Sequence, residues 1–371
     1  MLKKLAVLVT TAMVITSHLT ASPTNIFVNN TNPMSGDGSF GNPYNTLLAA
    51  QTASNVGDAI FVSVGDGTST GMNAGIVLKN NQSLIGIGLP LITNASGNGV
   101  ELADNNVVSG LHIDSTGAWG IHGANINTTN LSANLITNPL TQGGIGIFDG
   151  TATLNIVNST IKNGNSSENG IQINNTGSTA ATVVIKTNVI SNFFEGIVVF
   201  GFDNSAITSK IIQNDVSSTS SIGIDIDAFD FSQSSTTIKS NTVHDNTQNG
   251  IVTFSGNTNA FLEATIQKNS ITNSGLEGLV VATGNGGKQS AHVLGNTLSG
   301  NGGVAGMIAE TSLTATPGDV LCLQLHNNHS TTGYYLENFV GSTFNLEPLT
   351  GNVGTLTTAG TITPVPTGFC Q

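Results

Sequence analysis

The sequence predicts an all-β protein built as a coil of stacked parallel strands, and three observations support this prediction. The 371-residue chain contains 45 Gly and 45 Asn, which suit turns and are unfavourable inside helices. Apolar residues often alternate with polar ones, as in strands that turn one face inward. A glycine followed by an apolar residue also recurs at regular intervals along the chain.

The recurring glycine defines a repeat of about 26 residues. Its copies are Gly99, Gly120, Gly146, Gly170, Gly196, Gly223, Gly250, Gly278, Gly306 and Gly333. Between these glycines an Asn recurs before an apolar residue, as at Asn214, Asn241, Asn269 and Asn296. Asn tolerates left-handed backbone, and stacked copies are expected to hydrogen-bond as a ladder. Each strand is expected to pair with its counterpart one repeat away, at roughly 4.8 Å along the axis. The number of repeats predicts about ten or eleven coils.

The charge composition excludes several classes of protein. The chain has nine Lys, no Arg and 21 acidic residues, for a net charge of −12. It therefore lacks the basic surface of a nucleic-acid-binding protein. The abundance of Ile, Val and Thr together with the low charge also argues against disorder.

The N-terminus predicts export. Lys3 and Lys4 precede a short apolar run, and Ala21 is a small residue at a plausible cleavage point. We interpret residues 1–21 as a signal peptide; the alternatives are a short buried helix or a membrane anchor. The apolar run is shorter than the roughly 20 residues that a membrane span needs. The mature chain is thus expected to be secreted or at the cell surface, without a transmembrane segment.

The repeat resembles that of right-handed parallel β-helix proteins of the pectin-lyase-like superfamily. The resemblance covers about 76–338, and the block 22–75 is similar to the first strands and capping helix of exported members. Similar blocks also open the surface regions of Gram-negative autotransporter-type proteins. A helix at 45–53 with Asn45 as its N-cap would cover the open end of the coil.

The C-terminal segment 339–371 is expected to break the repeat and to fold over the last coils as a cap. It carries Pro348, Pro364 and Pro366. The two cysteines of the chain, Cys322 and Cys370, are candidates for one disulfide that would hold this tail.

The enzymes of the superfamily provide a test of activity. The resemblance implies an arginine base for pectate lyases and an arginine near paired aspartates for pectin methylesterases, and this chain has no arginine. Polygalacturonase-like hydrolases would show Asn-Thr-Asp and Asp-Asp motifs, which are also missing, and His122-Gly123 is a lone dipeptide match. These absences favour a protein that is not an enzyme, although catalysis by an unfamiliar site stays open.

Candidate site residues are expected at the position two residues after each repeat glycine, because the side chain at this position should point to solvent. This outward column is predicted to hold Glu101, His122, Phe148, Gln172, Val198, Asp225, Val252, Val280, Ile308 and Tyr335. Asp225 and Asp227 would face outward from one strand, about 6.5 to 7 Å apart, as weak catalytic candidates. No residues are predicted to bind a cofactor or a metal.

A cluster of aromatic and acidic residues spans three neighbouring repeats. It contains Phe200, Phe202, Asp203, Asp225, Asp227, Phe229, Asp230, Phe231 and Phe254. Phenylalanines beside carboxylates suit the stacking and hydrogen bonding of sugar rings. The alternative is that longer loops bury their own phenylalanines. A second feature is an apolar stripe at Val198, Val252, Val280, Ile308 and Tyr335, which either the tail covers or a partner contacts.

Three functional hypotheses remain. The first is an exported, non-enzymatic β-helix that binds a glycan or a surface protein, for example in adhesion. The second is a carbohydrate-active enzyme of the pectin-lyase-like group, either a polysaccharide lyase or a glycoside hydrolase. The third is a purely structural passenger rod.

Overall fold

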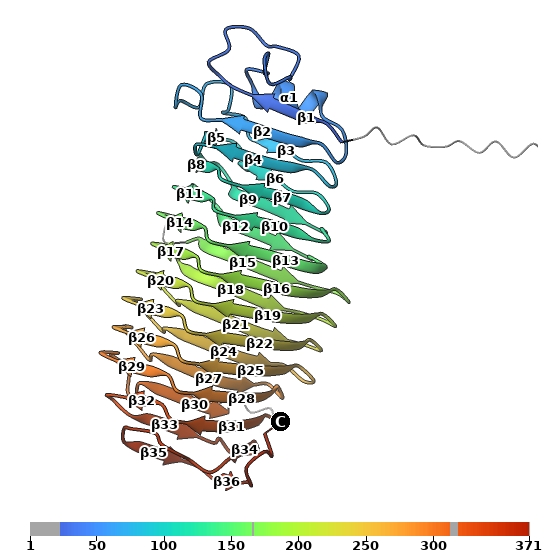
Figure 1. Cartoon of the computed structure of the whole chain (residues 1–371). Helices are drawn as coiled ribbons and strands as arrows, with labels where there is room; N and C mark the ends of the chain where they lie inside the picture. Colours follow the sequence, from blue (N-terminus) through green and yellow to red (C-terminus); the bar gives the residue numbers. More distant parts are fainter. Residues whose placement is uncertain (1–22, 165–166, 312–317, 371) are drawn as a thin grey trace, which may run out of the picture.

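The chain forms a coil of three parallel β-sheets, and the computed structural model describes residues 23–164, 167–311 and 318–370. Within these residues all pairings between named strands are parallel, each strand pairing with its counterparts in the neighbouring coils. Figure 1 shows the coils stacked from α1 (Leu47–Ala53) to β36 (Ile362–Pro364). The predicted all-β parallel coil is therefore confirmed. The predicted signal peptide lies outside the described residues.

The 14-stranded sheet runs the whole length of the coil. Besides β36, its strands are β1 (Asn25–Val28), β2 (Ala59–Ser63), β4 (Ser83–Ile87), β7 (Asn106–Ser109), β10 (Thr129–Ser132), β13 (Ala152–Val157), β16 (Ala180–Lys186), β19 (Ala206–Ile212), β22 (Gln233–Lys239), β25 (Phe261–Gln267), β28 (Lys288–Leu294), β31 (Val320–His326) and β34 (Thr343–Leu346). The adjoining 10-stranded sheet has shorter strands. They are β5 (Leu91–Asn94), β8 (His112–Thr116), β11 (Leu135–Thr137), β14 (Thr160–Lys162), β17 (Val189–Ser191), β20 (Asp215–Ser217), β23 (Thr242–His244), β26 (Ser270–Thr272), β29 (Thr297–Ser299) and β32 (His329–Ser330).

The 12-stranded sheet forms the third side and contains most of the predicted site residues. Its strands are β3 (Ile76–Val77), β6 (Val100–Glu101), β9 (Trp119–Ala124), β12 (Gly143–Phe148), β15 (Asn169–Asn175), β18 (Glu195–Gly201), β21 (Ile224–Phe229), β24 (Ile251–Gly256), β27 (Leu279–Gly284), β30 (Met307–Thr311), β33 (Tyr334–Glu337) and β35 (Leu356–Ala359).

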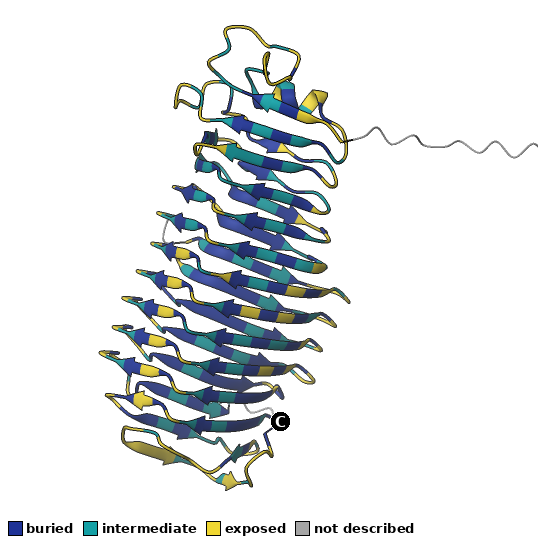
Figure 2. Cartoon of the chain, in the orientation of Figure 1, coloured by how far each residue is buried: buried dark blue, intermediate teal, exposed yellow. Residues whose placement is uncertain are grey.

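The core is the interior of the coil. Inward positions repeat the same kind of residue from coil to coil, as in the series Ile156, Ile185, Ile211, Ile238 and Ile266 of the 14-stranded sheet, all fully buried. Figure 2 shows buried positions alternating with more exposed ones along the strands. The period-2 pattern of the sequence thus places β-branched side chains in one continuous apolar column.

The repeating glycine is required by close contact between coils. A Cβ atom built on Gly223 would meet the side chain of Val243 and the carbonyl oxygen of Gly250 in the next coil. The same holds at Gly196 and Gly250, so any larger residue would push the coils apart. One copy differs from the prediction: Gly144, rather than Gly146, has this environment, since the following residue Ile145 pairs with Ile171.

The recurring Asn forms a buried ladder at the turn between the 14-stranded and 10-stranded sheets. From Asn214 to Asn352, the side-chain oxygen of each rung accepts from the backbone N–H and the side-chain amide of the preceding rung, while the amide also donates to a backbone carbonyl. For Asn241 these partners are Asn214 (2.8 and 3.0 Å) and the oxygen of Ile211 (2.8 Å). The left-handed residue is the one before each Asn, such as Ser240 (φ 55°), so the Asn is there for its side chain.

The helix at the N-terminal end begins one residue later than predicted. The N-cap is Thr46, whose hydroxyl accepts the backbone N–H of Ala49, and Asn45 lies outside the helix. A Thr hydroxyl, like an Asn side chain, can accept a free N–H of the first turn. Leu47 and Ala50 of this helix are fully buried.

The C-terminal segment differs from its predicted role as a cap that breaks the repeat. β34 and β36 extend the 14-stranded sheet, and β35 extends the 12-stranded sheet. Asn352 even adds a rung to the ladder, because its oxygen accepts the backbone N–H of Asn328 at 2.9 Å. Residues 339–364 therefore build another coil, and only the last few residues fold back.

Candidate functional site

The outer face of the 12-stranded sheet carries two columns of side chains, with one residue per coil. The first column contains Glu101, His122, Gly146, Gln172, Val198, Asp225, Val252, Val280, Ile308 and Tyr335. The second column contains Ala124, Phe148, Asn174, Phe200, Asp227, Phe254, Ala282, Glu310 and Glu337. Phe148 was predicted in the first column but lies in the second, because the repeat glycine of its coil is Gly144.

Four of the predicted phenylalanines contact one another on this face. Phe202 stacks on Phe229 with ring centroids 5.2 Å apart, and Phe200 meets Phe202 edge to face at 6.1 Å. Phe254 lies 5.7 Å from Phe229. All four rings are half-buried, so each keeps part of its surface open to solvent. We call these four residues the Phe cluster.

Asp203 does not join the Phe cluster. It is exposed in the turn after β18 with a left-handed backbone (φ 53°), and its carboxylate accepts the backbone N–H of Gly177 at 3.0 Å. An Asp that shapes a turn in this way has a structural role.

Asp225 and Asp227 form a carboxyl pair beside the Phe cluster. Asp225 is only 6% exposed and lies between Val198 and Val252 in the first column, so no carboxylate is stacked on it. The two side chains hydrogen-bond each other. Oδ1 of each residue is buried without a hydrogen-bond partner. A buried acceptor without a partner costs free energy, which makes the pair a candidate for ligand binding.

Burial and neighbouring charges hold this pair partly protonated near neutral pH. Burial, followed by the charges of Asp227 and Glu195, raises the pKa of Asp225 well above its usual range. Burial also raises the pKa of Asp227, to about 7, although the hydrogen bond from Asp225 lowers it. Asp225 therefore keeps the proton while Asp227 ionises first.

Glu195 is a residue of this site that sequence reasoning missed. Burial raises its pKa, and a hydrogen bond with the Ser221 side chain opposes that rise. Its charge acts on both aspartates. The sequence contains one signal for Glu195: it lies directly before the repeat glycine Gly196, at the first residue of β18.

A second polar and aromatic group lies nearer the N-terminal end of the same face. His122 Nδ1 is 2.8 Å from a carboxylate oxygen of Glu101, and the Asn98 side chain donates to the other oxygen. The ring of Phe148 lies 5.7 Å from His122 and 5.8 Å from Trp119. Parallel pairing stacks Glu101 on His122, although the sequence suggested only a chance dipeptide.

Of the two alternatives for the apolar stripe, cover by the tail is wrong. Val198 is fully buried, while Val252, Val280, Ile308 and Tyr335 are half-buried on the outer face. The tail instead continues the coil, with Thr357 of β35 beside Tyr335.

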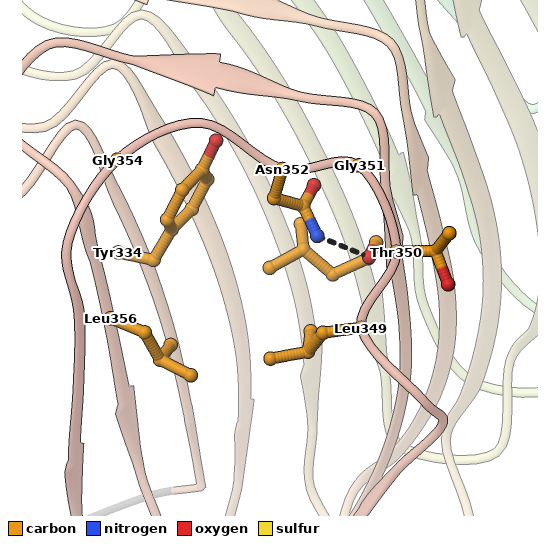
Figure 3. Close-up of a pocket in the computed structure, with 8 residues that line it drawn as sticks. Tyr334, Leu349, Thr350, Gly351, Asn352, Gly354 and Leu356 are labelled. Carbon is orange, nitrogen blue, oxygen red and sulfur yellow. Dashed lines mark hydrogen bonds between the residues drawn. The ribbon is translucent and has the colours of Figure 1, made fainter.

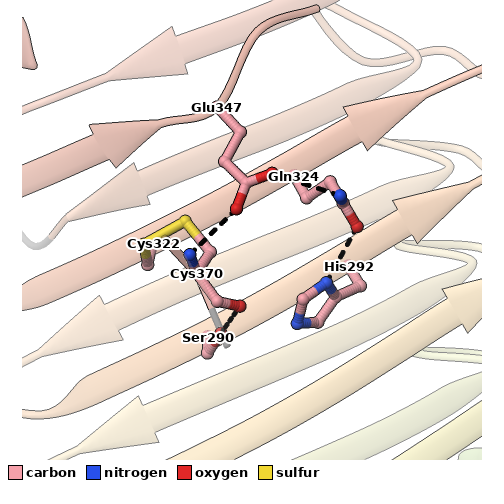
Figure 4. Close-up of a disulfide and its surroundings, with 6 residues drawn as sticks. All are labelled: Ser290, His292, Cys322, Gln324, Glu347 and Cys370. Carbon is pink, nitrogen blue, oxygen red and sulfur yellow. Dashed lines mark hydrogen bonds between the residues drawn. A yellow bond between two sulfur atoms is a disulfide. The ribbon is translucent and has the colours of Figure 1, made fainter. Parts of the chain in front are cut away.

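The chain end docks on the 14-stranded sheet through a disulfide between Cys322 and Cys370. Figure 4 shows the residues that hold it. The hydroxyl of Ser290 donates to the carbonyl oxygen of Cys370, and the backbone N–H of Cys370 donates to Glu347, both at 2.9 Å. Burial would raise the pKa of Glu347, but the N–H donors of Cys370 and Gly368, together with the Gln324 side chain and His292, lower it. Cys370 is thereby held by its backbone as well as by its sulfur.

The cavities at the C-terminal end do not involve the candidate site. One of about 180 Å³ opens at the bottom of the coil between Leu325, Tyr334 and Leu356 (Figure 3). In the described residues, no three His, Cys, Asp or Glu side chains are grouped to hold a metal ion. The described part also contains no helix long and apolar enough for a membrane span.

Comparisons with known proteins identify the class of fold. No family model and no curated protein sequence matches the chain. The A-module of the Azotobacter vinelandii mannuronan C-5 epimerase AlgE4 is similar in structure, with a TM-score of 0.51, 14% identity, and coverage of 92% of this chain and 98% of that chain. The A-module of the mannuronan C-5 epimerase AlgE6 from the same organism has a TM-score of 0.44 and 14% identity, and the match covers 86% of this chain and 92% of that chain. The pectate lyase Pel9A has a TM-score of 0.38, 14% identity and coverage of 94% and 81%.

The likeness to the AlgE4 module supports a right-handed parallel β-helix, as the sequence predicted. These similar proteins are carbohydrate-active enzymes by name. At this identity the likeness shows the fold alone, and activity must be argued from this chain's own residues. The resemblance to autotransporter-type regions stays a prediction.

Proposed function

We propose that the outer face of the 12-stranded sheet binds carbohydrate, with the Phe cluster and the Asp225–Asp227 pair at its centre. The observation that carries the proposal is the pair of buried carboxyl oxygens without partners beside half-buried aromatic rings. Sugar hydroxyls would donate to these oxygens, and the apolar face of a sugar ring would pack on phenylalanine. One ligand would thus satisfy both halves of the site.

The test measures binding of the purified full chain to a panel of soluble oligosaccharides by isothermal titration calorimetry. Phe229→Leu should weaken binding at least about tenfold, because the ring is lost while most of the apolar volume is kept. Phe200→Ala should weaken it as well. Phe261→Leu is the matched control, since Phe261 is a partly exposed phenylalanine on the 14-stranded sheet. Equal binding by all variants would refute the proposal.

A second candidate function is glycoside hydrolysis by Asp225 and Asp227. It is favoured by the raised pKa of both groups, which would leave a proton donor beside an ionised carboxylate at neutral pH. The geometry argues against it, because hydrogen-bonded carboxyl groups are closer than the roughly 5 to 9.5 Å that glycosidases use. We therefore place binding first.

The two functions are separated by incubation with acidic and neutral polysaccharides. New reducing ends or unsaturated products that disappear in Asp225→Asn would establish an enzyme. Retention of a polysaccharide without any product supports binding alone.

We also propose that the protein is exported and acts outside the cell, in adhesion to a glycan or a surface protein. The support is the predicted signal peptide and the disulfide, which persists in oxidising compartments. Mass spectrometry of the mature protein should find its N-terminus near Ser22. An intact Met1 in the cell-free fraction would contradict cleavage.

A further inference from the structure

Within the described residues, the outer face of the 12-stranded sheet carries carboxyl side chains but no Lys or Arg. The carboxyl groups lie on or directly beside its strands, at Glu101, Glu195, Asp225, Asp227, Glu277, Glu310 and Glu337. The lysines of the described part lie outside the strands of this sheet, at positions Lys79, Lys162, Lys186, Lys210, Lys239, Lys268 and Lys288. Lys79 follows β3, and its ammonium donates to the backbone oxygen of Ser54 at the capped end. The face therefore has acidic groups and no lysine of its own to balance them.

Two of these acids are stacked directly on each other. Glu310 of β30 pairs in register with Glu337 of β33, and both are half-buried. Burial raises the pKa of Glu310, and the charges of Glu337 and Glu277 add to the rise. Like charges on neighbouring strands are destabilising, so this arrangement is not explained by stability.

The acids flank an apolar path. Val252, Val280, Ile308 and Tyr335 follow one another in the first column, beside Glu310 and Glu337 in the second. Toward the N-terminal end this path reaches Asp225, which is 6% exposed and has an oxygen without a partner. The face thus offers apolar surface and hydrogen-bond acceptors together.

We infer that this face selects uncharged glycan chains and excludes chains that carry a carboxylate on each sugar. The inference rests on the proposed carbohydrate binding and names its ligand class. Hydroxyl groups of an uncharged glycan donate to carboxylates, and such charge-assisted hydrogen bonds are strong. A polyuronate would instead bring further negative charge against the acids, and like charges repel each other. Among the described residues of the face there is neither an arginine nor a lysine to bind the carboxylates of a polyuronate.

The experiment uses two matched pairs of probes, and the two members of a pair have the same type of backbone. Mannohexaose is compared with the hexamer of mannuronic acid, and cellohexaose is compared with the hexamer of glucuronic acid. Calorimetry with the full chain at low salt should show an uncharged hexamer bound at least about tenfold tighter than its uronate. The difference in affinity between the uncharged hexamer and its uronate should narrow in about 0.3 M salt, because exposed charges are then screened.

A double variant isolates the acids from the rest of the face. Glu310→Gln with Glu337→Gln should improve uronate binding about two- to fivefold. It should also weaken binding of the uncharged hexamer, because two carboxylates that accept from sugar hydroxyls are lost, so the difference in affinity between the two hexamers should narrow. Glu263→Gln is the matched control, since Glu263 is an exposed acid on β25 of the 14-stranded sheet. Thermal unfolding of each variant should show that the fold is kept.

The outcomes separate this inference from the proposed function. Uronates bound as tightly as uncharged hexamers, with binding lost in Phe229→Leu, would overturn the ligand class and keep carbohydrate binding. An unchanged gap in the double variant would likewise overturn the inference. Failure of both kinds of probe to bind would overturn the proposed function and this inference together.

Discussion

The Asn ladder and the outer face of the 12-stranded sheet repeat the same backbone geometry but use it in opposite ways. Along the ladder nearly every coil has the same residue, and each side chain is fully hydrogen-bonded. Along the first column the residue changes from coil to coil, and Asp225 has a buried oxygen without a partner. In a coil where each repeat supports the next, uniform columns hold the coils together. A column that varies is available for ligand recognition.

The largest expected effect comes from breaking the ladder. Asn241→Ala removes an oxygen that accepts from Asn214 and an amide that donates to Ile211. Because these buried groups lose their partners, the free energy of unfolding should fall by about 2–4 kcal/mol. Urea unfolding followed by far-ultraviolet circular dichroism measures this. Asn204→Ala, at an exposed turn, is the control, and an equal small loss in both would contradict the ladder's role.

The face should behave in the opposite way, because its acids are destabilising. In the unfolded chain the carboxyl groups ionise near pH 4, whereas in the folded chain Asp227 ionises at about pH 7 and the pKa of Asp225 is also raised well above its usual range. The folded state thus binds more protons between these values, and stability falls as pH rises through that window.

Asp225→Asn with Asp227→Asn removes this pH dependence. At pH 8 the double variant should be more stable than the parent chain by roughly 1–3 kcal/mol, and at pH 4 the difference should nearly vanish. Urea unfolding at both pH values checks the sign. A double variant that loses stability at pH 8 would mean that the pair is part of the scaffold.

The smallest expected effect comes from completing the ladder. Ser159 occupies one rung, where its hydroxyl accepts the backbone N–H of Asn134 at 3.3 Å. By the pattern of Asn188, which donates to Ile156, an Asn at position 159 would donate to the carbonyl oxygen of Leu131. Ser159→Asn should therefore raise the free energy of unfolding by about 0.5–1 kcal/mol. The midpoint of urea unfolding would move upward, and a downward shift would show that the rung cannot accept Asn.

The sequence predicted the uniform columns well and the varying ones poorly. Glycine and Asn recur because close approach and ladder bonding demand the same residue in every coil, so their spacing revealed the fold. The coil at 339–364 was missed because the position in register with the repeat glycine Gly333 is Thr355, which is not a glycine. The register at Phe148 was ambiguous because Gly144 and Gly146 both precede an isoleucine.

The candidate site depends on contacts between coils that have no fixed spacing in the sequence. Parallel pairing stacks Glu101 on His122 and Phe200 on Asp227, over separations of 21 and 27 residues. Alternation predicted that Asp225 faces outward, but it did not predict its burial. Burial depends on large neighbours in adjacent coils, and it is the burial that raises the pKa of the pair.

The disulfide gives the C-terminal end a distinct response to mechanical load. Tension applied at the chain end passes through Cys370 to Cys322 in β31, across the 48-residue loop that contains β34, β35 and β36. The final coil is thereby relieved of the load, and peeling must begin by pulling β31 from between its neighbours. After reduction the same tension would fall on β36, whose three residues pair with β34 alone. An oxidised chain should therefore withstand traction at this end that a reduced one would not.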